Sequence, residues 1–219
     1  MKSVIIVAGG SGTRMNSPVP KQFLLLKEIP VLFYSLSAFF QFDATIRILI
    51  ALPKELFGNW EELQRRFEIA IPHEVIPGGD TRFHSVLNCL HRLERDGLVA
   101  IHDGARPLVS QELIHRLFSA AEKNGNAIPV VPVQESIREV NGDSNQPADR
   151  SLFRIVQTPQ VFHTPLIKQA YDQPYQPKFT DDATVFESTG KPIHLVEGDP
   201  ANLKITYPAD LLVAEALLR

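Results

Sequence analysis

The sequence predicts an α/β protein built around a mostly parallel β-sheet, and three observations lead to this fold class. Short apolar runs typical of buried strands alternate with segments whose apolar residues recur at three- and four-residue spacing. A glycine-rich turn directly follows the first of these runs. The chain has 219 residues, which suits one domain with a sizeable core.

The expected strands are short and rich in β-branched residues. The first, Val4–Val7, is apolar throughout, as expected for a strand buried on both faces of a parallel sheet. The later strands are expected at Ile46–Leu52, Glu74–Ile76, Val99–His102 and Ile128–Val133. The expected helices are Val31–Phe42, Glu55–Phe67, Arg82–Arg95, Gln111–Lys123 and Ala209–Leu218. Because such sheets bind ligands beyond the carboxyl ends of their strands, functional side chains are expected there.

The loop after the first strand favours binding of a nucleoside triphosphate. Gly9, Gly10 and Gly12 lack Cβ atoms, so the backbone can turn sharply and present N–H groups to phosphate oxygens. Arg14 and Lys21 follow closely and add positive charge. An ordinary strand-to-helix turn is the alternative interpretation.

Two other phosphate-binding loops do not fit the residues. A P-loop needs the tripeptide Gly-Lys-Ser/Thr, which the chain lacks. The dinucleotide fingerprint needs a third glycine where Met15 stands, and an acidic residue about 20 positions later, where the chain reads Leu32 to Leu36. Nicotinamide chemistry is therefore disfavoured.

The next strand end carries a second glycine-rich loop. Gly78 and Gly79 expose backbone groups, while Asp80 and Ser85 are close enough in sequence to reach the same ligand, for which a base edge is a plausible partner. The alternative is a plain turn in which Thr81 caps the following helix.

The strand ending near residue 102 is followed by a carboxylate and an arginine. Asp103 suits a Mg²⁺ ion that takes its other ligands from a triphosphate, and Arg106 suits a second anion. In the alternative interpretation Asp103 merely pairs with Arg106. His102 points to the opposite face of the strand and is interpreted as a core residue.

Residues 134–156 interrupt the alternation and read as a projecting β-arm. Two strand-like stretches, Glu135–Val140 and Ser151–Val156, flank a polar turn. Because an isolated two-stranded arm is marginal in water, we expect another surface to cover it. A second subunit and the chain's own domain are the two candidates.

Composition excludes several classes of protein. The formal net charge of −3 provides no general basic field for nucleic acid. Cys89 is the only cysteine and lies among apolar residues, which indicates a packed thiol. The histidines lack zinc-ligand spacing, and no GxSxG elbow supports serine hydrolysis. The chain enters a strand at once and has no apolar run of membrane-spanning length, so we expect a soluble, cytoplasmic protein.

Further motifs lie near the C-terminus. They are Thr158-Pro159-Gln160, Thr180-Asp181-Asp182-Ala183, and the segment Asn202–Thr206 that contains Lys204. Lys204 is a candidate third cation for the phosphate site.

Together these motifs make the chain resemble the 2-C-methyl-D-erythritol 4-phosphate cytidylyltransferase family from end to end. AGGSGTRM, PKQF, GGDTRFHSV, HDGARP, TPQ, TDDA and VEGDPANLKIT stand in the family's order. The resemblance implies a single Rossmann-like domain over 1–219 that transfers CMP from CTP to a sugar-alcohol phosphate with Mg²⁺. It also implies a homodimer in which residues 134–156 form a dimerisation arm that completes the neighbour's site.

The same resemblance implies roles for individual residues. Arg14, Lys21 and Lys204 match the triphosphate-binding and catalytic cations. The nucleotide-binding positions are Ala8, Gly9, Gly10, Gly12, Gly78, Gly79, Asp80, Ser85 and Asp103, with Asp103 also the metal ligand. The acceptor-binding positions are Arg106, Ser136, Arg150 and Thr158.

The chain departs from the family pattern at a few positions. Ala8-Gly9-Gly10 replaces the commoner Ala-Ala-Gly and is similar to the related ribitol 5-phosphate cytidylyltransferases. Gly104 replaces an alanine, Ser136 a threonine, and Ala201 stands where an acidic residue is frequent. A cytidylyltransferase for ribitol 5-phosphate, another sugar-phosphate nucleotidyltransferase and a non-catalytic nucleotide-binding regulatory protein stay open as alternatives.

Overall fold

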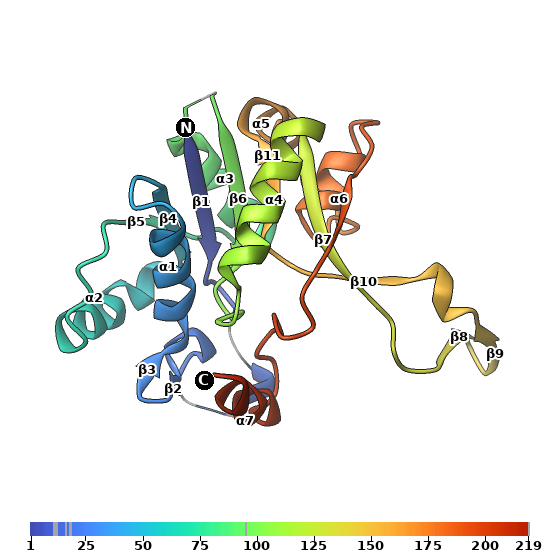
Figure 1. Ribbon diagram of the computed structural model, residues 1–219, viewed down its shortest axis with the longest axis horizontal. Helices are drawn as coiled ribbons and strands as arrows, with labels where there is room; N and C mark the ends of the chain where they lie inside the picture. The colour runs from blue at the N-terminus through green and yellow to red at the C-terminus, as the bar shows by residue number, and fades with distance from the viewer. Residues whose placement is uncertain (11–12, 16, 18, 95, 219) are drawn as a thin grey trace.

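Four neighbouring strands of the sheet run parallel and extend to one of its edges in the computed structural model, which describes residues 1–10, 13–15, 17, 19–94 and 96–218 (Figure 1). The sheet order is β10-β7-β11-β6-β1-β4-β5, with β12 beside β7. The strand bounds are β1 Lys2–Val7, β4 Arg47–Leu52, β5 Glu74–Pro77, β6 Leu98–Asp103, β7 Asn126–Pro132, β10 Arg154–Val156, β11 Gln160–His163 and β12 Leu195–Glu197. The predicted fold class is confirmed.

The register of the parallel strands brings their carboxyl ends to one edge. Val7, the last residue of β1, lies opposite Ala51 of β4 and Asp103 of β6. On the far side of β4, Leu52 lies opposite Pro77 of β5. The loops that follow these four strands therefore start side by side. The strands β10 and β11 run antiparallel to their neighbours and extend the sheet on the other side.

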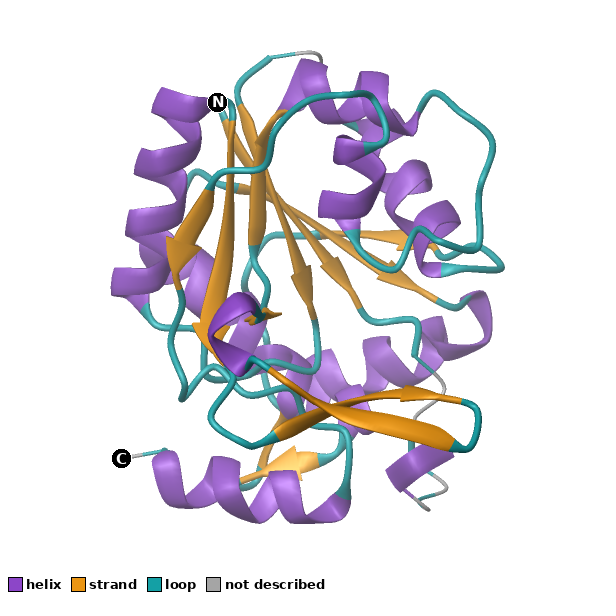
Figure 2. Ribbon diagram, turned by 90° about the vertical axis from the view of Figure 1, so that its right-hand side faces the viewer, coloured by secondary structure: helices purple, strands orange, loops and turns teal. Residues whose placement is uncertain are grey.

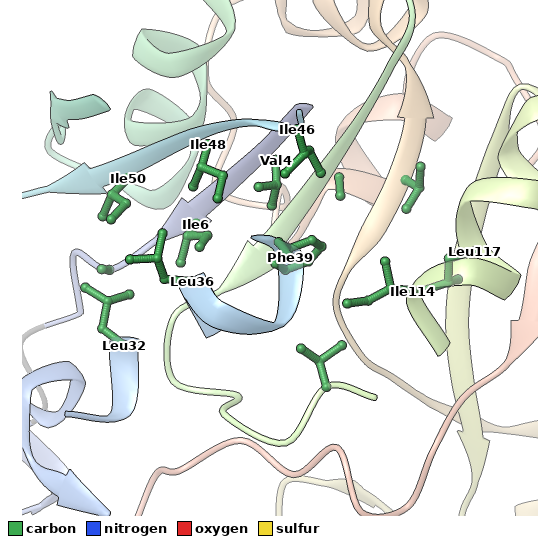
Figure 3. Close-up of a cluster of buried hydrophobic side chains, with 14 of the residues drawn as sticks. Val4, Ile6, Leu32, Leu36, Phe39, Ile46, Ile48, Ile50, Ile114 and Leu117 are labelled. Carbon is green, nitrogen blue, oxygen red and sulfur yellow. The ribbon is translucent and has the colours of Figure 1, made fainter. Parts of the chain in front are cut away.

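Helices cover both faces of the sheet. Successive strand residues point to opposite faces, and because apolar strand residues lie on both faces, both must be buried. The helices are α1 Val31–Phe42, α2 Phe57–Arg66, α3 Arg82–Arg92, α4 Gln111–Asn124, α5 Thr164–Tyr171, α6 Asp182–Glu187 and α7 Pro208–Leu217. Residues Val4 and Ile6 pack toward α1, α2 and α4, whereas Ile5 packs toward α3, α5 and α6. Figure 3 shows Leu32, Leu36 and Phe39 of α1 facing the strand residues of the first of these layers.

The segment that carries Lys21 is held against α2 by aromatic packing. Trp60 of α2 is fully buried, and its indole N–H donates a 3.0 Å hydrogen bond to Nε2 of His73. The Trp60 ring stacks on Phe23, with ring centroids 6.1 Å apart. Phe23 ends the 3₁₀ turn Lys21–Phe23, so the stack fixes this turn against the rest of the layer.

The C-terminal helix α7 packs against the N-terminal region. Ala214 joins Met15, Leu26, Val31 and Ile205 in a small buried cluster. Two short strands nearby, β2 Leu25–Leu26 and β3 Ile29–Pro30, pair with each other. Among the described residues, no helix is long and apolar enough to cross a membrane.

The predicted arm is present, but its second strand was placed wrongly. The strands β8 Ile137–Asn141 and β9 Ser144–Ala148 form a separate hairpin that projects from the body and faces the viewer in Figure 2. Gly142, at a φ of +58°, opens a two-residue turn, so the chain reverses earlier than predicted. The stretch 151–156, expected to pair with residues 135–140, instead continues from a 3₁₀ turn at Arg150–Leu152 into β10, which pairs with β7.

Candidate functional site

The loops at the carboxyl edge of the parallel strands enclose a pocket of about 220 Å³. Its lining comes from the loops after β1, β5 and β6 and from the C-terminal segment. The lining residues are Val7, Gly9, Gly10, Lys21, Gly79, Asp80, Thr81, Arg82, Ser85, Asp103, Ala105 and Lys204. A larger groove of about 810 Å³ lies between α3 and α5, but neither the glycine-rich loops nor Asp103 borders it. Its size alone therefore does not mark it as the site.

Asp103, at the end of β6, holds three cations around one carboxylate. Its Oδ2 lies 2.8 Å from Nζ of Lys204 and 3.5 Å from Nε of Arg106. Its Oδ1 lies 3.6 Å from Nε of Arg82. The predicted pairing of Asp103 with Arg106 is thus present, but it is one of three such contacts.

These contacts decide the ionisation of Asp103. Burial by itself would raise the pKa of the carboxyl, but Arg82, Lys204 and Arg106 together outweigh it and hold the pKa well below its usual range. Asp103 is therefore a fixed negative charge at neutral pH.

Lys21 reaches the pocket from the 3₁₀ turn that follows the first glycine-rich loop. Its Nζ donates a 3.1 Å hydrogen bond to the carbonyl of Ile205. Burial and, next, the positive charge of Lys204 lower the pKa of Lys21. An anion bound between the two lysines would relieve this repulsion. Gly10 lies in van der Waals range of Lys21, because a Cβ built there would be 3.6 Å from Cε of the lysine.

The second glycine-rich loop is fixed by Ser85. The Gly79 N–H donates a 3.0 Å hydrogen bond to Oγ of Ser85, and that hydroxyl donates to the carbonyl of Thr81 at 3.0 Å. Gly79 admits no side chain, because a Cβ would lie 2.4 Å from Cβ of His84. Thr81 also caps α3 by accepting from the His84 N–H. The Thr81 cap predicted by the turn interpretation is therefore confirmed, and the loop also lines the pocket, with Asp80 exposed at its rim.

A buried hydrogen-bonded chain supports the end of β6 from behind. His102 is fully buried, and its Nε2–H donates to the carbonyl of Arg106 at 3.1 Å. Its Nδ1 then accepts from the Thr158 hydroxyl at 3.2 Å, and that hydroxyl oxygen accepts the Asp103 N–H at 3.0 Å. Burial lowers the pKa of His102 to about 4, which keeps the ring neutral. The interpretation of His102 as a core residue is confirmed.

The C-terminal segment carries Lys204 into the pocket. The Ile205 N–H donates to the carbonyl of Ala105 at 2.8 Å, and Nη1 of Arg106 donates to the carbonyl of Asn202 at 2.8 Å. Asn202 in turn donates from Nδ2 to the carbonyl of Thr158 at 2.8 Å. This segment therefore joins the loop after β6 to the Thr158 region.

Some predicted site residues lie away from the pocket. Arg14 is exposed, with its guanidinium 5.7 Å from the centroid of the Tyr207 ring, although its charge contributes to lowering the pKa of Lys21. Ser136 and Arg150 are exposed on the arm, where Nη1 of Arg150 donates to the carbonyl of Gln134. Gly12 lies outside the described residues. Ala8 is buried just before the pocket, and its carbonyl accepts from Gln22 at 2.7 Å.

Sequence reasoning missed Arg82 and Asp182, which the fold brings together at the back of the pocket. Nη1 and Nη2 of Arg82 donate to Oδ1 and Oδ2 of Asp182 at 2.9 and 2.7 Å. Asp182 belongs to the TDDA motif, for which the residues alone indicate no role. This acidic motif was the one sequence feature that could have indicated the ion pair. Arg82, the partner of Asp182, lies 100 residues away in the chain.

The pocket fits a divalent cation only with the help of a substrate. Within 1–10, 13–15, 17, 19–94 and 96–218, no group of three or more His, Cys, Asp or Glu side chains could hold a metal. Asp103 offers one carboxylate, and Mg²⁺ is commonly held by one or two carboxylates plus substrate oxygens and water. The donor set therefore fits Mg²⁺ that arrives with a polyphosphate.

Comparisons with known proteins agree on one family. The family model described as 2-C-methyl-D-erythritol 4-phosphate cytidylyltransferase matches residues 2–219. The chain is 47% identical over 217 residues to the protein of that name from Bacteroides thetaiotaomicron, covering 99% of both chains. Its identity to the protein of that name from Geobacillus kaustophilus is 41%, over 98% of this chain and 95% of the other.

Similar solved structures belong to the same family. The 2-C-methyl-D-erythritol 4-phosphate cytidylyltransferase from Thermus thermophilus aligns with a TM-score of 0.77 at 34% identity, over 98% of this chain and 97% of the other. The Francisella tularensis enzyme of the same name aligns with a TM-score of 0.83 at 28% identity, over 99% of both chains.

The neutral, buried His102 leads to a prediction for stability against pH. The folded pKa of about 4 lies below the usual 6.5, so the unfolded chain takes up a proton between these pH values while the folded chain does not. Stability that His102 contributes above about pH 6.5 should be lost as the pH falls toward about 4, by about 2–3 kcal/mol. Urea unfolding of the wild type and of His102→Gln at both ends of this range measures the loss.

The variant isolates His102 from other groups, because burial also lowers the pKa of His73. His73 should contribute equally to both proteins, so His102→Gln should lose less stability on acidification than the wild type. Equal losses in the two proteins would contradict the assignment.

Proposed function

The chain belongs to the 2-C-methyl-D-erythritol 4-phosphate cytidylyltransferase family, and we propose that the pocket around Asp103 is where its two phosphorylated substrates meet. As a family member the protein is a CTP-dependent nucleotidyltransferase of the non-mevalonate isoprenoid pathway. It transfers CMP from CTP to 2-C-methyl-D-erythritol 4-phosphate and releases pyrophosphate. What we propose beyond this is the assignment of its residues, its metal and its assembly.

One observation carries the assignment of the site. Lys204, Arg106 and Arg82 surround Asp103, and Lys21 lines the same pocket as Lys204. This concentration of positive charge borders two glycine-rich loops at the carboxyl edge of the sheet. It suits the joining of two polyanions, where mutual repulsion is the main obstacle.

The chemistry needs no protein nucleophile. An oxygen of the acceptor phosphate attacks the α-phosphorus of CTP in line. The bond between the α-phosphorus and the oxygen that bridges to the β-phosphate breaks, and pyrophosphate leaves with the electron pair of that bond. The attacking oxygen is already anionic at neutral pH, so no strong general base is required. Lys21, Lys204 and Arg14 would stabilise the charge on the α-phosphoryl group and on the departing pyrophosphate.

Other residues would hold the two substrates. The backbone of Ala8, Gly9, Gly10 and Gly12 would approach the triphosphate, and Gly78, Gly79, Asp80 and Ser85 would contact cytosine. Asp103 would hold Mg²⁺, which supplies charge neutralisation on the phosphate oxygens when bound. Arg106 and Thr158 would orient the acceptor phosphate from the same subunit.

We propose that residues 1–219 act as one domain in a homodimer and that the arm, 134–156, completes the partner's site. The arm carries uncovered apolar side chains, an arrangement that usually marks an interaction surface. They are Val140, Leu152, Phe153, Ile155 and Val156, each at least 40% exposed. Ser136 and Arg150 stand on the same arm, away from the pocket of their own chain.

We also propose that the enzyme works in the cytoplasm and needs no nucleic acid or membrane. Cys89 is free and buried, and burial raises its pKa to about 12, as suits an inert thiol. A single unpaired cysteine agrees with a reducing compartment.

The proposal is tested first by turnover with defined substrates. Pyrophosphate release from CTP should be fast with 2-C-methyl-D-erythritol 4-phosphate and far slower with ribitol 5-phosphate. UTP should replace CTP only at a kcat/KM lower by about tenfold or more, because a wrong base edge leaves buried polar groups unpaired. Equal kcat/KM values for CTP and UTP would mean that the Gly79 loop does not read the base.

Removing the Lys21 cation should act mainly on the chemical step. Lys21→Ala is expected to fold and to lower kcat by about a hundredfold or more, since a cation that binds the transition state better than the ground state acts on kcat. Steady-state kinetics with circular dichroism measure this. Lys123→Ala, an exposed lysine in the last turn of α4, is the control and should keep full activity. A folded Lys21→Ala enzyme with near-normal kcat would exclude the assignment.

Complementation tests whether the arm acts across the dimer. Arg150→Ala and Lys21→Ala chains, each nearly inactive alone, should regain activity after subunit exchange, because a mixed dimer has one site with neither change. Statistical mixing limits the recovery to about a quarter of the wild-type sites. Verified exchange without recovery, or a fully active monomer, would show that Arg150 does not act in trans.

A further inference from the structure

The ion pair between Arg82 and Asp182 lies beside the proposed metal site, because Nε of Arg82 also faces Oδ1 of Asp103 at 3.6 Å. Asp182 is fully buried, and its two carboxylate oxygens take both terminal nitrogens of Arg82 at 2.9 and 2.7 Å. Oδ1 also accepts the Tyr171 hydroxyl at 2.6 Å. Both terminal nitrogens of the Arg82 guanidinium are therefore engaged by Asp182 in a bidentate ion pair.

The position of Asp182 is fixed independently of Arg82. Asp182 is the first residue of α6, directly after Asp181, whose carboxylate caps the helix by accepting the Thr184 N–H at 2.9 Å. Gln160 of β11 donates to Oδ2 of Asp181 and accepts the Ala183 N–H, both at 2.8 Å. The carboxylate of Asp182 thus stands on a helix start that is attached to the sheet.

This arrangement leaves Oδ1 of Asp103 without a hydrogen bond from the described residues, although Arg82 lies within ion-pair distance of it. Only Nε of Arg82 faces Oδ1 of Asp103, at 3.6 Å, which is beyond hydrogen-bond distance. The other oxygen, Oδ2, is occupied by Lys204 at 2.8 Å. Across the part of the chain that the structure describes, no hydrogen bond reaches Oδ1.

We propose that Asp182 is a positioning residue that keeps the Arg82 guanidinium off Asp103, so that Oδ1 of Asp103 stays available to the magnesium-bound nucleotide. This inference rests on the proposed role of Asp103 as the metal ligand. Arg82 provides a nearby positive charge without occupying the oxygen. Without Asp182, the Arg82 guanidinium would turn to the neighbouring carboxylate of Asp103 and bind it in the bidentate geometry that arginine favours.

The test measures how much Mg²⁺ strengthens CTP binding, rather than activity. Isothermal titration calorimetry gives the Kd of CTP with and without MgCl₂, and the ratio of the two values is the metal-dependent gain. Asp182→Asn should reduce this gain at least about fivefold, because a hydrogen-bonded guanidinium competes with the cation for Oδ1.

Two further variants separate positioning from a purely structural role. Asp181→Asn can still cap the same helix but replaces the oxygen that accepts from Gln160, so it should lower Tm while leaving the metal-dependent gain unchanged. Arg82→Gln combined with Asp182→Asn removes the competing fork and should restore the gain close to the wild-type value. The double variant keeps the test decisive if Asp182→Asn alone does not fold, because it replaces the buried ion pair by two neutral amides.

The outcomes discriminate clearly. A wild-type gain in folded Asp182→Asn, or a double variant that has lost the gain, overturns the positioning role and leaves the proposed site intact. A wild type in which Mg²⁺ does not strengthen CTP binding removes the metal role of Asp103, and this inference with it. Failure of the proposed function itself would instead be seen as CTP binding without pyrophosphate release.

Discussion

The negative charge of Asp103 is the constraint on which the pocket depends. Arg82, Arg106 and Lys204 converge on this one carboxylate, and Lys21 stands beside them. Without the carboxylate their mutual repulsion would oppose folding of the site. Burial works against ionisation of Asp103, and the surrounding cations more than compensate. A folded chain can therefore keep a strongly cationic pocket, where we propose that two polyanions meet, while its formal net charge is −3.

Parallel topology explains why residues so far apart in sequence meet there. The register places the ends of β1, β4, β5 and β6 at one edge, so the loops after β1, β5 and β6 form walls of one pocket. The C-terminal segment then closes the site from outside the sheet. Hydrogen bonds from Ile205 and to Asn202 attach it to the loop after β6, and Lys21 donates to it from the N-terminal side. The segment that carries Lys204 is thereby held by contacts from the N-terminal part and from the middle of the chain.

The parts of the fold that local sequence determines were predicted well. Apolar runs and helical spacing located β1, β4, β5, β6 and β7 and most of α1 to α4 within a few residues. The elements β11, β12, α5 and α6 were missed, because strands of three or four residues and helices of six or eight carry too little periodicity. The second strand of the arm was misplaced because its apolar residues pair with β7, whereas polar residues, Ser144–Ala148, form the hairpin. Tertiary pairing, which local pattern does not encode, also accounts for the missed contact of Arg82 with Asp182.

Trp60 gives the molecule an intrinsic optical reporter. It is the only tryptophan in the chain, it is fully buried, and it stacks on Phe23 at the end of the 3₁₀ turn that carries Lys21. Its indole N–H is hydrogen-bonded to the imidazole of His73, so the fluorescence emission of Trp60 depends both on the ring stack and on that hydrogen bond. Any displacement of the Lys21 turn when a polyanion is captured would alter the surroundings of this one fluorophore, so capture and release could be followed in real time on the unlabelled protein.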